Sequence, residues 1–230
     1  MTGRPFDALF VDFYGTVASG DGAAVAAACQ VIVRDLALPF TAEAFAVIWG
    51  QQYFAMVDRS NGDDFRTLHE CEMVSLQETV RPHVGEIDAA PLVAGLEAYW
   101  QDAGIHTDAK EMLAAVDLPT CCVSNADTTP LKIAIKRHDL RFDHVVTSEQ
   151  TRSYKPDPVI FERALEKTGV AASRVAHVGD SLHSDILGAA KLGITTIWIN
   201  RENRIHDIGN TRPDHTIHSL AEIPDLLARS

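Results

Sequence analysis

Five short apolar runs, each bounded by turn residues, constrain the fold of this chain more than any other feature. They are residues 8–13, 120–123, 144–147, 175–178 and 195–199. Such runs without polar alternation are typical of strands buried on both faces of a parallel sheet. Helical patterns follow the later runs, at residues 131–138, 158–168 and 184–192. This alternation predicts an α/β protein with a doubly wound, Rossmann-like and mostly parallel sheet.

The interval between the first and second runs is too long for one crossover connection. It holds amphipathic stretches and no strong strand signal, around residues 23–36, 41–57, 63–79 and 89–103. We therefore expect a helical cap domain over residues 19–101, inserted into a core domain of residues 1–18 and 102–230. The last thirty residues predict a loop, a small edge strand near 215–217 and a closing helix.

The charge balance argues against several classes of partner. The chain of 230 residues carries 32 acidic and 20 basic side chains, a formal charge of −12, which disfavours binding to nucleic acid through bulk charge. The N-terminus lacks a signal-peptide pattern, and no apolar run is long enough to cross a bilayer. The four cysteines lack metal-binding spacing, so we expect reduced thiols and a cytoplasmic location. The sequence leaves a homodimer open.

Polar residues follow the predicted strands at the points where ligands bind in open α/β sheets, beyond the carboxyl ends of the strands. Taken singly, each also fits a turn or a helix cap. Together they would bring carboxylates, an ammonium, hydroxyls and an amide to one rim. These residues are Asp12, Tyr14, Gly15 and Thr16, then Ser124, Asn125 and Asp127, then Lys155, and finally Asp180, His183 and Asp185.

At this point the sequence resembles the haloacid dehalogenase superfamily of hydrolases, over nearly its whole length. The segment "DFYGT" is similar to the first motif and "VSN" to the second, while "YKPDP" and "GDSLHSD" resemble the third and fourth. The helical insertion matches the cap of one large subgroup. The resemblance implies a nucleophilic aspartate, here Asp12, supported by Ser124, Lys155, Asp180 and Asp185.

The chemistry implied is covalent catalysis, in which Asp12 attacks phosphorus or an electrophilic carbon and water hydrolyses the intermediate. Lys155 would keep Asp12 ionised. A small anionic substrate would be bound by Ser124 and by the substrate-binding positions Gly15, Thr16, Asn125 and Asp185. Asp12 and Asp180 make an oxygen-rich site suited to Mg²⁺, and the resemblance adds the main-chain carbonyl of Tyr14 as a third ligand.

Tyr14 divides the expectations about the reaction. Most phosphatases of the superfamily have an acid/base aspartate there, whereas a phenol with a pKa of about 10 is a poor general base. The 2-haloacid dehalogenase branch has the same "YGT", and halide needs no general acid. Against that branch, "GDSLHSD" is the metal-binding form of the fourth motif. The cap also reads "WGQ", Trp49 to Gln51, where dehalogenases have an arginine that binds the anion; Arg59, Arg66 or Arg152 could replace it.

We therefore expect an Mg²⁺-dependent hydrolase of small phosphate monoesters, with Asp12, Tyr14, Lys155 and Ser124 as catalytic residues. One alternative is a metal-free 2-haloacid dehalogenase, and another is a ligand-binding member with little turnover. The cap aromatics Trp49, Tyr53 and Phe54 have near-helical spacing and are expected to pack in the cap. His183 is expected either to face the site or to be solvated, and His69 to lie on the surface.

Overall fold

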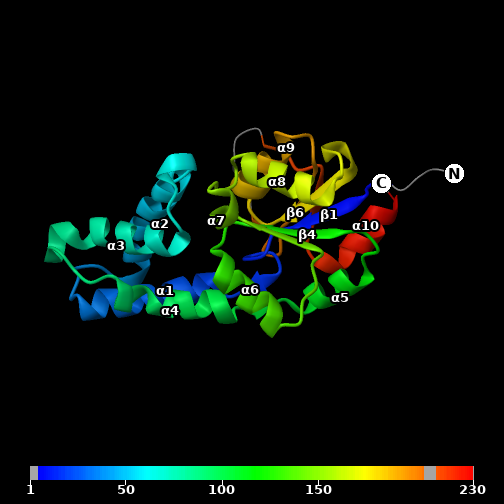
Figure 1. Cartoon of the computed structure of the whole chain (residues 1–230). Helices are drawn as coiled ribbons and strands as arrows, with labels where there is room; N and C mark the ends of the chain where they lie inside the picture. The colour runs from blue at the N-terminus through cyan, green and yellow to red at the C-terminus, as the bar shows by residue number, and fades with distance from the viewer. Residues whose placement is uncertain (1–4, 205–210, 230) are drawn as a thin grey trace.

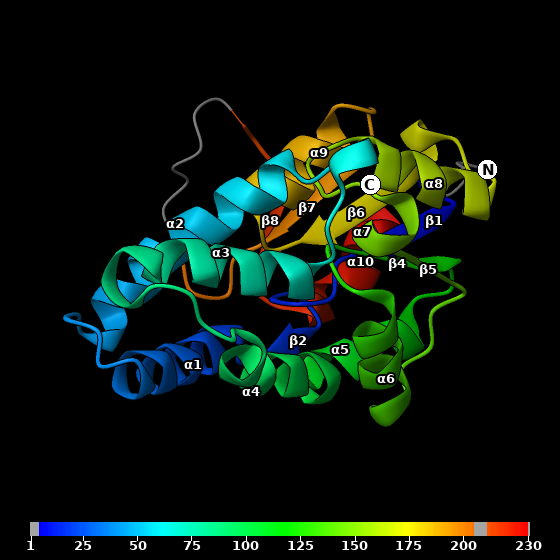
Figure 2. The same ribbon diagram turned by 60° about the vertical axis from the view of Figure 1, so that its left-hand side comes forward.

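A six-stranded sheet forms the centre of the molecule. The structure is a computed structural model that describes residues 5–204 and 211–229. The strand order is β5-β4-β1-β6-β7-β8 and every pairing in this sheet is parallel, which confirms the predicted fold class (Figures 1 and 2). The strands are β1 (Ala8–Val11), β4 (Thr120–Ser124), β5 (His144–Thr147), β6 (Val175–Gly179), β7 (Thr195–Ile199) and β8 (His215–Ile217).

The order in which strands are added to the sheet reverses at β1, which is the topological switch point. From β1 the chain moves outward through β4 to β5, then returns to the other side of β1 and moves through β6 to β8. Ligands of open α/β sheets bind at the carboxyl ends of strands near such a switch. The residue that follows β1 is Asp12.

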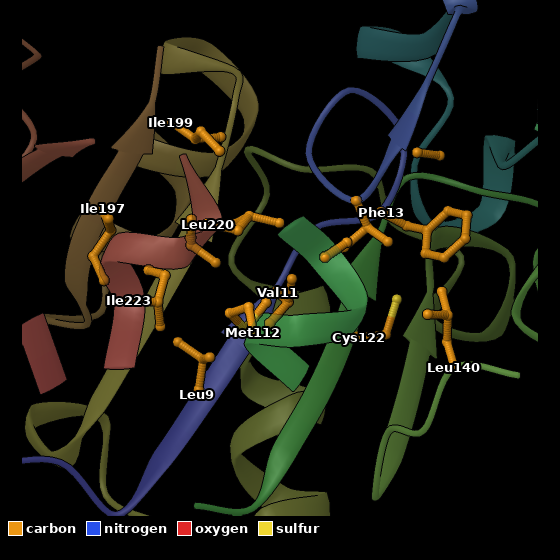
Figure 3. Close-up of a cluster of buried hydrophobic side chains, with 14 of the residues drawn as sticks. Leu9, Val11, Phe13, Met112, Cys122, Leu140, Ile197, Ile199, Leu220 and Ile223 are labelled. Carbon is orange, nitrogen blue, oxygen red and sulfur yellow. The ribbon is translucent and has the colours of Figure 1, made fainter. Parts of the chain in front are cut away.

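Helices cover both faces of the sheet, which explains why the strands read as continuous apolar runs. In β1, Leu9 and Val11 face one hydrophobic cluster (Figure 3). Ala8 and Phe10 face another, as the two-residue period of a strand requires. The first face is covered by α5 (Thr107–Ala115), α6 (Thr128–Arg137) and α10 (Ile223–Arg229), and the second by α8 (Val159–Thr168) and α9 (Gly188–Ala190).

The long interval after β1 forms a separate layer of four helices with its own hydrophobic cluster. They are α1 (Asp21–Asp35), α2 (Ala42–Arg59), α3 (Leu68–Val84) and α4 (Ala90–Asp102) (Figures 1 and 2). Two short strands, β2 (Ala18–Ser19) and β3 (Gly104–Ile105), pair antiparallel where the chain enters and leaves this bundle. The two connecting segments therefore lie side by side, so the chain enters and leaves the helical bundle at the same place.

Polar contacts join the helical bundle to the sheet. Asp127, in the loop after β4, accepts hydrogen bonds from the backbone N–H groups of Leu68 (2.8 Å) and His69 (3.0 Å) at the start of α3. The hydroxyl of Tyr154 donates to the carbonyl of Arg66 (2.6 Å). A carboxylate at a helix N-terminus satisfies backbone donors that have no partner within the helix. The bundle is thus held above the carboxyl edge of the sheet.

Several expected boundaries were wrong. The first strand ends at Val11, two residues early, because the backbone turns at Gly15 (φ +86°) and Phe13 accepts three turn hydrogen bonds. The helix expected at 184–192 is a π-helical turn over Leu182–Leu187 followed by α9, because Ser181 accepts a capping bond from Ser184. Helix α5 and strands β2 and β3 were not predicted. Residues 205–210 of the expected loop lie outside the described residues.

The remaining short elements are α7 (Ser148–Thr151) and 3₁₀ turns at Gly62–Asp64, Ala172–Arg174 and Leu220–Glu222. Cys29, Cys71, Cys121 and Cys122 are all buried with free thiols, as expected. Over residues 5–204 and 211–229, the structure has no helix with the length and apolar character needed to span a membrane.

Candidate active site

Asp12 directly follows β1 and lies beside the end of β6. Its backbone N–H donates to the carbonyl of Val178 in β6 (2.9 Å), and its side chain is buried. Lys155 Nζ donates to Asp12 Oδ1 at 2.7 Å. Burial raises the pKa of Asp12, and this charge-assisted contact opposes that shift by stabilising the ionised carboxylate, the form that can attack an electrophile.

Lys155 is buried and shared between two carboxylates. Besides Asp12, its Nζ donates to Asp185 Oδ1 (2.6 Å) and to the carbonyl of Val123 (3.0 Å), so all three ammonium protons have acceptors. Burial alone would lower the pKa of Lys155, but the charges of Asp12 and Asp185 outweigh it and raise the pKa above its usual value. Lys155 therefore stays protonated.

The loop that carries Lys155 is fixed by Asn125. The Asn125 carboxamide accepts from the backbone N–H of Lys155 (2.7 Å) and donates to its carbonyl (3.1 Å). Asn125 therefore positions Lys155, although it also lines the pocket described below. The neighbouring Ser124 lines the same pocket, and its buried Oγ has no hydrogen-bond partner among the described residues. An unpartnered buried hydroxyl is available to a ligand oxygen.

Asp185 is the second carboxylate that accepts a hydrogen bond from the Lys155 ammonium. Its Oδ1 also contacts His177 Nε2 (3.0 Å), and its Oδ2 accepts from the backbone N–H of Ser181 (3.1 Å). Burial would raise the pKa of Asp185, but Lys155 and His177 lower it well below the usual value. A Cβ on Gly179 would lie 2.1 Å from Asp185 Cγ, so only glycine lets the carboxylate approach the end of β6.

Asp180 is the third carboxylate of the centre. A Cβ on Gly15 would lie 2.7 Å from Asp180 Oδ1, so the glycine after Tyr14 makes room for this side chain. Burial, together with the charges of Asp12 and Asp185, raises the pKa of Asp180 to about 7. The guanidinium of Arg204 contacts the Asp180 carbonyl (2.6 Å) and Oδ2 (3.3 Å) from the rim.

The three carboxylates fit a divalent cation. Asp12, Asp180 and Asp185 each offer an oxygen within 4.8 Å of the other two, and one buried ammonium lies among them. The negative charge therefore exceeds the buried positive charge, and this repulsion adds to the effect of burial in raising the pKa of Asp180. Carboxylate oxygens are the ligands that Mg²⁺ prefers. The residues present therefore fit Mg²⁺ in charge and donor type.

Gly15 and Thr16 contribute less to the site than the sequence suggests. The backbone N–H of Gly15 donates to Ala18 (3.1 Å) and that of Thr16 to Phe13 (3.3 Å), so neither is directed to a ligand. The Thr16 hydroxyl is buried and has no hydrogen-bond partner in the described part of the chain, yet Thr16 is not among the residues that line the pocket. Both residues shape the turn after Asp12.

The hydroxyl of Tyr14 is engaged with the helical bundle. It donates to the carbonyl of Trp100 in α4 at 2.5 Å, and the two rings pack edge to face with centroids 4.9 Å apart. Burial, with smaller effects from Cys122 and Tyr99, raises the pKa of Tyr14 far above its usual value. In this geometry the phenol does not offer its proton to a leaving group.

A pocket of about 660 Å³ opens from this centre toward the helical bundle. Trp49, Tyr53 and Phe54 line it; Trp49 is also packed in the bundle's cluster, whereas Phe54 is largely exposed. His183 lines the pocket, and its Nε2 lies 3.8 Å from Asp58 Oδ1. His69 is partly exposed outside this pocket.

None of the three arginines suggested by the sequence lines the pocket. Arg59 lies near Glu78, and Arg152 binds the carbonyls of Gly62 and Asp63. Among the described residues the one arginine in the lining is Arg204.

Three residues that line the pocket or contact its carboxylates were not predicted from the sequence. His177 could have been noticed as a histidine in an apolar strand, and Glu72 as a carboxylate on the buried side of an expected helix. No local signal marks Arg204.

Fold and centre together define an α/β enzyme whose active site is assembled around an aspartate and a lysine. A family model described as haloacid dehalogenase-like hydrolase matches residues 6–193. The chain therefore belongs to the haloacid dehalogenase-like hydrolase family, as its motifs predicted.

Relatives in this family differ in activity. The chain is 37% identical to the pyrimidine 5'-nucleotidase YjjG of Escherichia coli over 110 residues, 46% of this chain and 48% of that one. It is 24% identical to the (S)-2-haloacid dehalogenase H-109 of Pseudomonas putida over 97% of this chain and 99% of that one. The L-2-haloacid dehalogenase structure from Xanthobacter autotrophicus has a TM-score of 0.77 at 21% identity, covering 96% and 98% of the two chains.

Coverage of the relatives varies. Matches to three curated relatives span 34%, 48% and 52% of those proteins, so the chain matches about a third to a half of their length. The relatives named above include both a nucleotidase and a 2-haloacid dehalogenase.

Proposed function

We propose that the protein is an Mg²⁺-dependent hydrolase of small phosphate monoesters that uses Asp12 as its nucleophile. The observation that carries this proposal is the surplus of carboxylates around Lys155, with Asp12, Asp180 and Asp185 mutually within 4.8 Å. A cation balances this charge and lets an anionic substrate approach. Without one, Asp180 would repel a phosphate or a carboxylate alike.

In the proposed first step, a carboxylate oxygen of Asp12 attacks phosphorus and the bond to the ester oxygen breaks. The phosphoryl group is then carried by Asp12 as an acyl phosphate. Lys155 keeps Asp12 ionised before attack, and Ser124 Oγ is free to donate to a phosphoryl oxygen. In the second step water attacks phosphorus, which releases inorganic phosphate and restores the Asp12 carboxylate.

Mg²⁺, when bound, would offset the charge on the transferring group. Asp12 and Asp180 would hold it, with the main-chain carbonyl of Tyr14 as a further ligand. Asp185 contacts Lys155 and His177, so we assign it to positioning the ammonium.

Tyr14 has a consequence for the choice of substrate. Because its hydroxyl donates to Trp100, the leaving oxygen must take its proton from water. Esters of acidic alcohols, such as phenols, leave without early protonation. The proposed enzyme therefore hydrolyses aryl phosphates faster than alkyl phosphates.

Residues 19–101 are proposed to act as a cap that covers the substrate. Support comes from the pocket, which is lined by sheet residues on one side and by α2, α3 and α4 on the other. A cap of this kind excludes bulk water from the acyl phosphate until hydrolysis.

A 2-haloacid dehalogenase is the second candidate. Two observations favour it: the "YGT" sequence after Asp12 and the whole-length match to a protein named as an (S)-2-haloacid dehalogenase. Against it stands Asp180, whose carboxylate adds negative charge where a haloacid carboxylate would bind.

The two candidates respond differently to chelator. Phosphate release from 4-nitrophenyl phosphate is expected to disappear with EDTA and return with Mg²⁺. Halide release from 2-chloropropionate that is unaffected by EDTA would instead support the dehalogenase. A protein inert toward both substrates, yet stabilised against heat by Mg²⁺ and phosphate, would support the ligand-binding alternative.

A further inference from the structure

A buried carboxyl group, Glu72 in α3, lies at the cap end of the pocket with one oxygen uncommitted. Glu72 is 2% exposed and lines the pocket. Its Oε1 accepts from Trp100 Nε1 at 2.7 Å. Its Oε2 is buried and has no hydrogen-bond partner among the described residues. Among the described residues, the basic side chain paired with this oxygen is His69, whose Nδ1 lies 4.0 Å from Oε2, too far for a hydrogen bond.

The surroundings of Glu72 are unfavourable to a charge without a partner. Burial raises its pKa to about 8 despite the bond from Trp100, and the carboxylates of Asp127 and Glu97 add to the shift. Leaving a buried carboxyl oxygen unpaired costs stability, and proteins keep few such groups without a reason. The negative charges nearby favour the positive end of a dipole, which means an N–H or O–H group.

Apolar and aromatic side chains of the cap line the pocket beside Glu72. Trp49, Tyr53, Leu96 and Trp100 line the same pocket as Glu72, opposite the carboxylate–lysine centre. Tyr14 links the two ends, because its hydroxyl donates to the carbonyl of Trp100 while the Trp100 indole donates to Glu72. These two hydrogen bonds therefore connect Glu72, through Trp100, to Tyr14 at the end of the sheet.

We propose that Glu72 is a specificity-determining residue whose ionised carboxylate accepts a hydrogen bond from an N–H or O–H group on the organic part of the substrate, the bound donor taking the place of the proton that the carboxyl otherwise holds. The inference rests on the proposed phosphate-ester hydrolysis and deepens it. The substrate class is a phosphate monoester with an apolar or aromatic body that carries such a donor on the side remote from the phosphate. A site with a buried acceptor rejects an analogue that lacks the donor, because the acceptor is then left unpaired.

The test measures binding of phosphonates, which cannot be hydrolysed, by calorimetry in Mg²⁺ at pH 9, where the Glu72 carboxyl is ionised. Phenyl- and benzylphosphonates carry an amino, a methyl or an acetyl group at the meta or para position, so that a donor, an apolar group or an acceptor reaches different depths. We expect at least one amino compound to bind about tenfold more tightly than its methyl counterpart.

Glu72→Gln isolates the oxygen in question. A glutamine can keep an acceptor for Trp100 and replaces Oε2 by an amide NH₂, which only donates. The amino-over-methyl preference is expected to fall to within twofold, and the acetyl compound is expected to gain. Glu78→Gln, on the same helix but exposed and outside the pocket lining, is the matched control and is expected to keep the wild-type ratios.

The outcomes separate the two proposals. An equal affinity for amino and methyl compounds, or a preference that persists in Glu72→Gln, overturns the role of Glu72. Uniform weakening of all compounds in Glu72→Gln overturns it too, because that is the result of a structural role. If the phosphonates bind with the expected preference but 4-nitrophenyl phosphate is not hydrolysed, the proposed hydrolysis fails while Glu72 stands as a ligand-recognition residue. Failure of every phosphonate to bind overturns both.

Discussion

The two ends of the pocket treat their carboxylates in opposite ways. At the sheet end, Asp12 and Asp185 share the ammonium of Lys155, and Asp180 meets Arg204. At the cap end, one oxygen of Glu72 accepts a hydrogen bond from Trp100, and the other has no partner within residues 5–204 and 211–229. The sheet end is thus organised before any ligand arrives, whereas the cap end is completed by a ligand. We infer that the first end performs the chemistry and the second chooses the substrate.

The largest expected effect is a loss of turnover when the nucleophile Asp12 is substituted. Asp12→Asn removes the attacking oxygen's charge but keeps its size and leaves Lys155 paired with Asp185. We expect turnover of 4-nitrophenyl phosphate to fall on the order of 10⁴-fold or more, as when other covalent catalysts lose their nucleophile. Steady-state phosphate release measures this, with circular dichroism to verify folding. Turnover within tenfold of wild type would contradict covalent catalysis.

Removing the shared cation tests how much the sheet end depends on pairing. Lys155→Met leaves Asp12 and Asp185 buried without their ammonium, which we expect to lower the free energy of unfolding by about 3–5 kcal/mol at pH 7. The loss should shrink toward pH 4, because protonated carboxyls need no counter-charge. Urea unfolding measures it, and Lys191→Met, at an exposed lysine that binds the Pro156 carbonyl, is the control. Equal effects of the two substitutions would contradict the account.

The pH dependence of the free energy of unfolding tests whether Glu72, at the cap end, is protonated in the folded protein. With a folded pKa of about 8 and an ordinary value of 4.5, Glu72 binds a proton more tightly in the folded state. Its contribution is therefore lost as the pH rises from about 5 to 8, at up to about 1.4 kcal/mol per pH unit. Glu72→Gln should remove this slope and gain stability relative to wild type at pH 8. Parallel stability–pH curves for the two proteins would show that Glu72 is not protonated.

The smallest expected effect concerns Tyr14, which joins the two ends. Tyr14→Asp supplies a group able to protonate the leaving oxygen, so hydrolysis of an alkyl phosphate should rise about tenfold while that of 4-nitrophenyl phosphate changes little. Tyr14→Phe keeps the ring packing against Trp100 and should change either rate less than about twofold. Loss of activity in Tyr14→Phe would mean that the phenol takes part in proton transfer.

The sequence predicted the sheet well because its strands are buried on both faces. The runs at 144–147, 195–199 and 215–217 match β5, β7 and β8, since turn residues bound them. The first run was extended by two residues because Asp12 and Phe13 remain buried after pairing ends. Helix α5 was missed because it lies between the cap signals and β4, with only Ala109 and Met112 fully buried.

The candidate site was predictable where it depends on strand ends and was not where it depends on folding at a distance. Asp12, Lys155 and Asp185 follow predicted strands, so the topology gathers them. Arg204 reaches Asp180 from a loop after β7, and Glu72 enters the pocket from the cap. No local pattern fixes such approaches, because they depend on how the cap and the loops pack against the sheet.

The central claim is that Asp12 carries the phosphoryl group during turnover. Rapid acid quenching with an aryl phosphate and Mg²⁺, followed by peptide mass spectrometry, tests it most directly. We expect a phosphoryl adduct on the Asp12 peptide that is absent after chelation and absent in Asp12→Asn. Phosphate release in wild type with no adduct on that peptide, or with the adduct on another residue, would contradict it.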